Sequence, residues 1–240
     1  MTVRRHTSRF GALAVVLAGF AAPAMTPARA APAVPDTMAQ RALACTGCHG
    51  DQGRSRPDGY VPRLAGKPAG YLFAQLRAFR DGRRRNETMA ALLDPLDDRM
   101  LAALAAHFAG LSVPYPPPAQ SLAAGPDAER ARQLVQAGDP ERRIPACTAC
   151  HGQALTGVAP AVPGLLGLPA DYLVSQLGAW RTGHRVARDP DCMAGIARRL
   201  PEGDVARVAR WLAAQPVPQA SGPATQPPGD WPLACGGVSP

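Results

Sequence analysis

The sequence predicts an all-α protein built from two tandem copies of one small helical domain. Three observations lead to this prediction: a stretch of sequence occurs twice, apolar residues recur at helical spacing in both copies, and no convincing stretch alternates apolar and polar residues as a strand does. Aromatic residues make up only 5% of the 240 residues, while there are 24 glycines and 27 prolines. A core of large side chains is therefore sparse, and a bulky group other than side chains is expected inside each copy.

The first 30 residues are expected to be a secretory signal peptide that is removed. Three arginines precede an apolar stretch at residues 10–22, and Ala28-Arg29-Ala30 has the small-residue pattern of a cleavage site. The apolar run is shorter than the ~20 residues that span a bilayer, which disfavours an uncleaved membrane anchor. We therefore expect an exported protein whose mature chain begins at Ala31.

The mature chain is expected to be only weakly basic. The full sequence has a formal net charge of +8, and residues 1–30 hold four basic and no acidic side chains, which leaves 22 basic against 18 acidic side chains and a charge of +4. The longest basic cluster, residues 83–85, is short, and no basic run has interleaved aromatic residues. Nucleic acid is therefore not expected as a partner.

The repeat covers most of the chain. Residues 44–50 (Ala-Cys-Thr-Gly-Cys-His-Gly) match residues 146–152 (Ala-Cys-Thr-Ala-Cys-His-Gly) at an offset of 102 residues. Residues 62–82 match the second copy at an offset of 101, and Met89 matches Met193 at 104; such small changes are typical of loop insertions. The expected order is signal peptide 1–30, N-terminal domain 31–113, Pro-rich linker 114–124, C-terminal domain 125–215 and Pro-rich tail 216–240.

Three helices are expected in each copy. The first covers residues 37–44 in one copy, with Asp36 as its N-cap, and residues 127–137 in the other. The middle helices have Pro68 and Pro169 in their first turns, a position that proline favours. The last helices carry apolar residues at helical spacing: Leu101, Leu104 and Phe108, and Val205, Val208, Trp211 and Leu212.

Each copy contains one Cys-x-x-Cys-His pentapeptide, a motif typical of covalent c-type haem attachment. Two thiols one helical turn apart can form thioethers with the vinyl groups of one haem, and the adjacent histidine can bind the iron from one face. A four-Cys zinc site or two local disulfides are the alternatives, but neither requires a histidine after the second cysteine in both copies. The sequence therefore predicts two covalently bound haem c groups, held by Cys45, Cys48, His49, Cys147, Cys150 and His151.

A methionine in each copy is expected to be the second axial ligand of the iron. Met89 lies 40 residues after His49, and Met193 lies 42 residues after His151. Met100 competes for the first haem, but it falls on the expected last helix and has no methionine counterpart in the second copy. Methionine usually only fills a core, yet equivalent placement in two copies favours ligation.

Together these motifs resemble the cytochrome c4 family, dihaem class I cytochromes c of bacterial periplasms. The resemblance runs from about Thr37 to Gln215 and rests on the Cys-x-x-Cys-His-Gly, Pro-x-Leu-x-Gly, Tyr-x-x-x-Gln-Leu and Gly-x-Arg motifs and the later methionine. It implies two class I cytochrome c domains, each wrapped around one haem with His and Met ligands. It also implies that the carbonyls of Pro62 and Pro163 accept a hydrogen bond from the second nitrogen of each proximal histidine.

The resemblance implies a periplasmic electron carrier with no catalytic turnover of its own. Members of the family carry electrons between respiratory complexes and terminal oxidases, so redox proteins are the expected partners; whether the protein stays loosely at the membrane is left open. His and Met ligation favours fast one-electron exchange. Arg84 and Arg185, which follow the glycines that end the middle helices, are expected either to pair with haem propionates or to be solvated surface charges.

Two cysteines stand apart from the haem motifs: Cys192 immediately precedes Met193, and Cys235 lies in the tail. In an oxidising compartment this remaining pair is expected to form a disulfide. The alternative is a Cys192 thiolate that binds the second haem, which would make the protein a haem enzyme that oxidises a sulfur compound. A peroxidase with one open iron and a cytochrome subunit of a dehydrogenase complex are the further alternatives.

Overall fold

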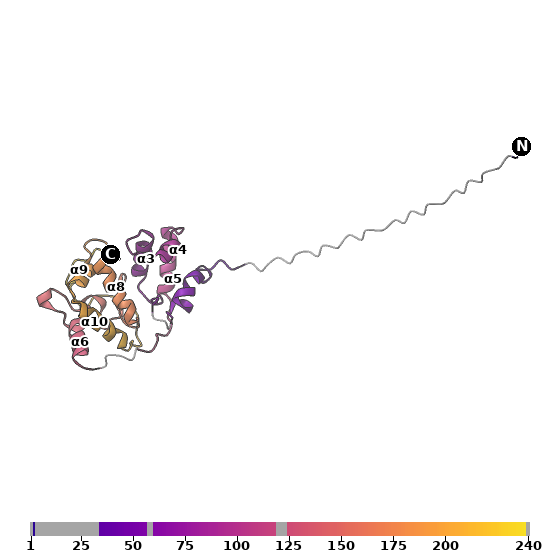
Figure 1. The fold of residues 1–240 in the computed structure, drawn as a ribbon. Helices are drawn as coiled ribbons and strands as arrows, with labels where there is room; N and C mark the ends of the chain where they lie inside the picture. Colours follow the sequence, from indigo (N-terminus) through magenta and orange to yellow (C-terminus); the bar gives the residue numbers. More distant parts are fainter. Residues whose placement is uncertain (1, 3–33, 57–59, 119–123, 239–240) are drawn as a thin grey trace. The chain divides into compact units, whose positions relative to one another are not determined.

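The computed structural model describes residue 2 and residues 34–56, 60–118 and 124–238. Residues Asp36–Pro240 form one compact unit, coloured from indigo to yellow in Figure 1. The signal peptide expected at residues 1–30 lies outside the described residues apart from Thr2, and so do residues 119–123 of the expected linker.

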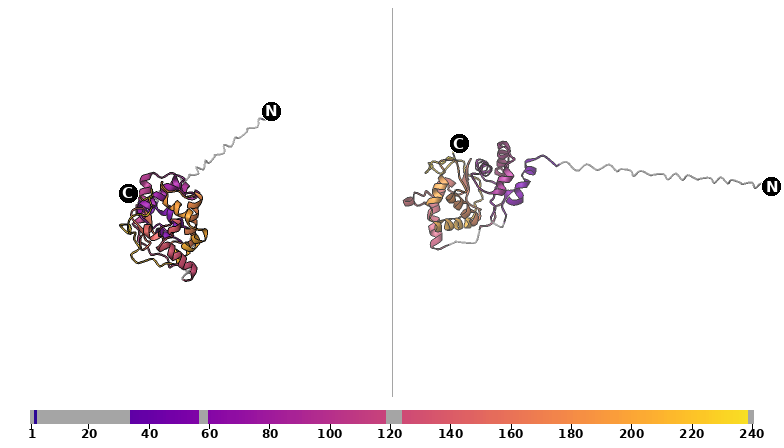
Figure 2. Two further views of the ribbon diagram at one scale, coloured as in Figure 1. Left: turned by 90° about the vertical axis from the view of Figure 1, so that its left-hand side faces the viewer. Right: turned by 45° about the horizontal axis from the view of Figure 1, so that its top comes forward.

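Short helices dominate both copies, which we call the first and second repeats. The first repeat holds α1 (Met38–Arg41), α2 (Leu43–His49), a 3-10 turn η1 (Asp51–Gly53), α3 (Ala69–Arg80), α4 (Glu87–Leu93) and α5 (Asp98–Ala109). The second repeat holds α6 (Pro126–Gln136), η2 (Pro140–Arg142), α7 (Cys147–His151), α8 (Ala170–Thr182), α9 (Cys192–Arg199) and α10 (Glu202–Ala214). Both views in Figure 2 show these helices joined by loops.

The all-α prediction is confirmed, with one small addition. Among the described residues the two strands are β1 (Gly157–Val158) and β2 (Val162–Pro163), which pair antiparallel in the second repeat. Each is only two residues long, too short to show the alternation that marks a strand in a sequence.

The first helix differs from the prediction: the helix expected over residues 37–44 is divided at Ala42 into α1 and the start of α2. Thr37, not Asp36, is the N-cap of α1, because its hydroxyl accepts a hydrogen bond from the backbone N–H of Gln40 at 3.2 Å. Asp36 instead forms an ion pair with Arg41 at 2.7 Å. The short helices α4 and α9, which carry Met89 and Met193, were not among the three helices expected in each repeat.

Each repeat has an apolar core of its own. In the first repeat α5 packs against α3, and in the second α10 packs against both α6 and α8. The buried residues of the first core are Ala42, Leu72, Leu104, Ala105 and Phe108. Those of the second include Ala131, Leu134, Val135, Leu173, Val205, Val208 and Leu212. The predicted apolar faces of the last helices therefore point into the two cores.

The Pro-rich tail packs along the second repeat. Ala224 pairs with the β-hairpin, where its N–H donates to the Gly157 carbonyl at 2.9 Å and its carbonyl accepts from Ala159 N at 2.8 Å. Further along, the N–H of Gly236 donates to the Pro190 carbonyl at 3.0 Å, just before α9. The tail thus contacts both the hairpin and the start of α9. Among the described residues, no helix combines the length and apolar character needed to cross a membrane.

Candidate cofactor sites

The two Cys-x-x-Cys-His motifs lie on the short helices α2 and α7, and the histidine is the last residue of each. His49 and His151 are buried, with 7% and 8% of their surfaces exposed. The following glycine, Gly50 or Gly152, has a positive φ of 77° or 84°. A Cβ on Gly50 would lie 2.6 Å from the carbonyl oxygen of Ser55, so the turn that directs the chain away from His49 needs glycine.

Each buried histidine donates a hydrogen bond to a proline carbonyl in the loop that faces it. The Nδ1 of His49 lies 2.7 Å from the Pro62 oxygen, and the Nδ1 of His151 lies 2.7 Å from the Pro163 oxygen. A carbonyl only accepts, so Nδ1 carries the hydrogen. Burial is the main reason that the pKa of both imidazoles lies below its ordinary value. Each ring is therefore neutral, with an unprotonated Nε2 that can bind a metal ion.

The four motif cysteines are free thiols in the structure, so neither pair forms a local disulfide. Burial raises the pKa of the Cys45 and Cys150 thiols, which keeps both in the protonated form. In the part of the chain that the structure describes, no three or more His, Cys, Asp or Glu side chains gather as a metal site. The zinc alternative therefore finds no ligand set there, whereas two free thiols on one helical turn suit a covalent cofactor.

Met89 and Met193 lie in the first turns of α4 and α9, and both are half-buried. The N–H of Met89 donates to the side chain of the N-cap Asn86 at 2.9 Å, which fixes where the methionine enters the helix. Helix α4 packs against α3, and α9 packs against α8, so the two methionines hold equivalent positions in the repeats. Their ligation to iron remains a prediction.

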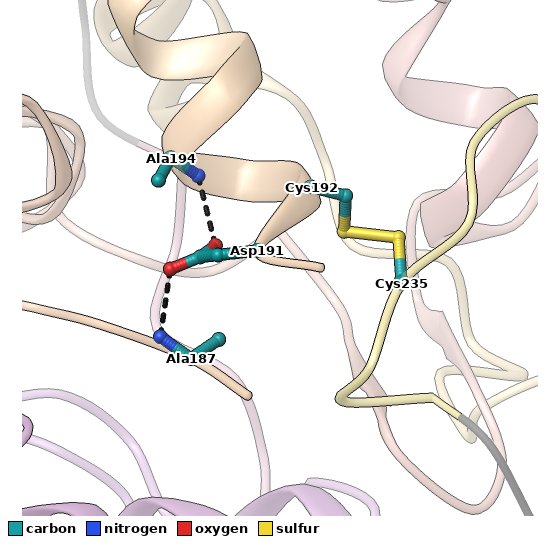
Figure 3. Close-up of a disulfide and its surroundings, with 5 residues drawn as sticks. All are labelled: Ala187, Asp191, Cys192, Ala194 and Cys235. Carbon is teal, nitrogen blue, oxygen red and sulfur yellow. Dashed lines mark hydrogen bonds between the residues drawn. A yellow bond between two sulfur atoms is a disulfide. The ribbon is translucent and has the colours of Figure 1, made fainter. Parts of the chain in front are cut away.

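A disulfide joins Cys192, the first residue of α9, to Cys235 of the tail (Figure 3). The preceding residue, Asp191, caps α9: one carboxylate oxygen accepts from Ala194 N at 2.9 Å and the other from Ala187 N at 2.7 Å. The tail is therefore anchored next to Met193. Because its sulfur is bonded to Cys235, Cys192 is not a thiolate in this structure.

Two arginines meet at the boundary between the repeats, and we call their surroundings the arginine cluster. Arg84 Nη2 donates to Gln176 Oε1 at 2.6 Å and to the Tyr172 hydroxyl at 3.1 Å. Arg185 Nη2 makes the equivalent bonds to Gln75 Oε1 at 2.8 Å and to the Tyr71 hydroxyl at 3.3 Å. Both arginines are buried, so the alternative that they are solvated surface charges is wrong. The cluster consists of Arg84, Arg185, Gln75, Gln176, Tyr71 and Tyr172.

The role of this cluster at the boundary between the repeats was not predicted from the sequence. A Tyr-x-x-x-Gln pattern followed nine residues later by Arg occurs in both copies, and this was the available signal. Pairing of the arginines with haem propionates remains a prediction. The structure adds a related observation: among the described residues, three buried side-chain nitrogens lack a hydrogen-bond partner, Arg77 Nε, Trp180 Nε1 on α8 and Arg199 Nε. Such an N–H suits a carboxylate acceptor, so the residues present fit a haem with propionate groups.

The chain is similar to curated proteins over most of its length. It is 39% identical over 189 residues to the thiosulfate dehydrogenase electron acceptor of Thiomonas intermedia, a match that covers 78% of this chain and 86% of that protein. It is 35% identical over 174 residues to cytochrome c4 of Pseudomonas aeruginosa, covering 72% and 84% of the two chains. No protein-family model matches the chain.

The fold is also similar to a solved structure. Reduced recombinant cytochrome c4 from Pseudomonas stutzeri superimposes with a TM-score of 0.64 at 28% sequence identity, over 74% of this chain and 96% of that one. Both repeats therefore take part in the match.

Proposed function

Because this chain belongs to the cytochrome c4 family, we propose that it is a periplasmic carrier that takes single electrons from a thiosulfate dehydrogenase and passes them to a respiratory acceptor. The chain holds two covalently bound haem c groups, one at each Cys-x-x-Cys-His helix. Redox proteins are its partners. The donor is proposed from the Thiomonas relative, which is named as an electron acceptor of thiosulfate dehydrogenase.

One observation carries the proposal: the same buried histidine and proline carbonyl unit occurs in both repeats, with the same 2.7 Å hydrogen bond. Bound haem supplies a reversible one-electron couple. The proline carbonyl fixes the orientation of each imidazole and leaves Nε2 of His49 or His151 for the iron. Met89 and Met193 would supply the second protein ligand to each iron. Rigid ligands that are the same in both oxidation states favour fast exchange.

The boundary between the repeats supports transfer between the two haems. The charge of Arg84 lowers the pKa of His49, and the charges of Lys67 and Arg185 lower the pKa of His151, in addition to the larger effect of burial. Both proximal histidines are thus within electrostatic reach of side chains at or beside this boundary. We therefore propose that electrons also pass between the two repeats across this boundary.

The Cys192–Cys235 disulfide supports a carrier over a sulfur-oxidising enzyme. A thiolate ligand needs a free, deprotonated Cys192, and the disulfide removes that group. Met193 is then the sulfur ligand that the second haem is proposed to use.

The test uses the purified protein with both haems and a purified thiosulfate dehydrogenase. The oxidised protein is mixed with the enzyme and thiosulfate in a stopped-flow instrument, and haem reduction is followed by absorbance. We expect both haems to become reduced only when enzyme and thiosulfate are both present. The weak long-wavelength band from sulfur to ferric iron, measured per haem, is expected at full methionine intensity.

The controls separate the candidate functions. Reduction by thiosulfate without the enzyme would identify a sulfur-oxidising haem enzyme. Absence of reduction with the enzyme, together with two intact methionine bands, would contradict the proposed donor and leave an electron carrier for another dehydrogenase. Half of the methionine band intensity, with thiolate or high-spin features in its place, would contradict the proposed ligands.

A further inference from the structure

Lys67 is the only lysine among the 26 basic residues of the chain, and it is buried with 4% of its surface exposed. It lies in the loop before α3 in the first repeat. Its ammonium nitrogen Nζ donates a hydrogen bond to the carbonyl of Gly164, in the second repeat, at 2.8 Å. Burial removes the ammonium group of a lysine from water at a large cost in hydration free energy, so the group needs a specific hydrogen-bond acceptor inside the protein.

The partner of Lys67 lies beside the second haem site. Gly164 directly follows Pro163, whose carbonyl accepts the hydrogen bond from His151 Nδ1. The ammonium bonds to Gly164 and not to the proposed iron ligand. The charge of Lys67 still acts on His151 through space: burial has the largest effect on the pKa of His151, and the ammonium lowers that pKa further. Lys67 therefore places a positive charge next to the loop that orients the second proximal histidine.

The first haem site has a different cation in its loop. At the 101-residue offset, Lys67 corresponds to Leu168, and Gly164 corresponds to Arg63. Arg63 is buried, and its guanidinium stacks on the ring of Tyr115, 3.8 Å from the ring centroid. An arginine keeps its charge at every physiological pH, whereas a buried lysine can lose its proton. The two sites thus differ in one titratable charge.

We propose that Lys67 is a positioning residue that sets the reduction potential of the second haem: its ammonium raises that potential, and the potential falls when the ammonium loses its proton. Ferrous haem carries one positive charge less than ferric haem, so a nearby cation disfavours the ferric state more and favours reduction. The proposal rests on the proposed function, in which His151 binds the iron of a carrier.

The titration of Lys67 falls in an accessible range. Burial, followed by the charge of Arg63, lowers its pKa to about 7. Among the described residues, the charged and titratable groups that interact with it are Arg63 from its own loop and His151 from α7. Below this pKa the ammonium is present and the second potential is high; above it the amine is neutral and the potential is lower. By linkage, reduction of the second haem raises the pKa of Lys67 and promotes proton uptake from solvent.

The test is a spectroelectrochemical titration of the holoprotein from pH 5.5 to 8.5. In the wild type we expect one of the two potentials to fall as the pH rises through about 7, with a steeper slope than the other. Lys67→Met is expected to lower that potential at pH 5.5 and to lose the extra slope. Lys67→Arg, which keeps the charge, is expected to hold the potential high at every pH. Leu168→Met is the matched control and is expected to change neither slope.

Two readouts make the result decisive. Met89→His marks the first haem, because a second histidine ligand lowers its potential and leaves the second haem in place. The proposal fails if the pH-dependent potential belongs to the first haem, or if Lys67→Met keeps the wild-type slopes. Haem content and the methionine band, recorded for each variant, show whether the sites are intact. Failure here would leave enzyme-driven reduction by thiosulfate unchanged, so it is distinct from failure of the proposed function.

Discussion

Arg84 and Arg185 are paired across the boundary between the repeats: their backbones form an antiparallel bridge, and each sends its guanidinium to a glutamine of the opposite repeat. Each guanidinium also lies over an aromatic ring of its own repeat. Arg84 is 4.4 Å from the centroid of the Phe79 ring, and Arg185 is 3.8 Å from that of Trp180. The two guanidinium groups carry the same charge, and each is stabilised by hydrogen bonds to neutral acceptors and by contact with the face of an aromatic ring.

Arg84→Ala is expected to lower the free energy of unfolding of the holoprotein by about 3 kcal/mol, because it removes buried hydrogen bonds from a charged donor. Chemical denaturation followed by circular dichroism measures the change. Arg83→Ala is the matched control: Arg83 pairs with Asp81 near the surface, so its loss is expected to cost under about 1 kcal/mol. Equal effects of the two variants would contradict a structural role for the cluster.

The glycine after the first motif histidine is expected to be required for haem loading. Gly50→Ala places a Cβ against the Ser55 carbonyl and strains a residue with positive φ, which is expected to cost about 2 kcal/mol or more. We expect less haem per chain, measured from the absorbance of the denatured protein. Gly47→Ala is the control within the same helix, where nothing lies within 4 Å, and it is expected to be neutral or slightly stabilising.

Cys192→Ser with Cys235→Ser is expected to reduce stability without changing the haem spectrum. The disulfide spans 43 residues, and on the chain-entropy model its loss costs up to about 4 kcal/mol. Thermal unfolding with and without a reductant measures this cost. Cys235→Ser alone leaves Cys192 as a free thiol next to Met193. If that variant showed thiolate coordination at neutral pH, the preference for Met193 would be refuted.

Arg130→Gln is expected to make the protein more sensitive to acid. Arg130 bonds to Asp139 at 2.8 Å and is the main reason that the pKa of Asp139 lies below its ordinary value of 3.8. A carboxyl group with a depressed pKa stabilises the fold above its unfolded pKa, and this contribution is lost as the pH falls through the folded value. The variant is expected to unfold at a higher pH in an acid titration followed by circular dichroism.

Arg132→Gln is the matched control for this acid titration. Arg132 lies on the same helix α6 and pairs with Glu129, which is exposed at the surface. Solvent screens that pair, so its removal is expected to shift the acid transition less. A shift as large as that of Arg130→Gln would contradict a special role for the Asp139 pair.

The features that the sequence predicted well are local. The Cys-x-x-Cys-His motif fixes thiols and histidine within one short helix, and the middle helices at residues 69–80 and 170–182 follow from their apolar periodicity. Pro68 and Pro169 mark where these helices start, although each is the N-cap and not, as predicted, a residue of the first turn. The first N-cap was predicted wrongly, because Asp36 and Thr37 are both good capping residues. In the structure Thr37 caps the helix and Asp36 forms an ion pair with Arg41.

The contacts that the sequence did not predict are distant in the chain. Lys67 meets Gly164 across 97 positions, and Arg84 meets Gln176 across 92. Neither contact leaves a periodic signal, because each depends on how the two repeats pack together. Helices α4 and α9 are also too short for their apolar pattern to stand out.

The six cysteines of the chain need two different oxidation states in the same compartment. Cys192 and Cys235 have to be oxidised, whereas the four motif thiols have to remain reduced until haem is attached. Burial protects one of the motif thiols, because it raises the pKa of the Cys147 thiol to about 12. Disulfide exchange needs a thiolate, so a folded second repeat can close its tail disulfide while Cys147 stays protected.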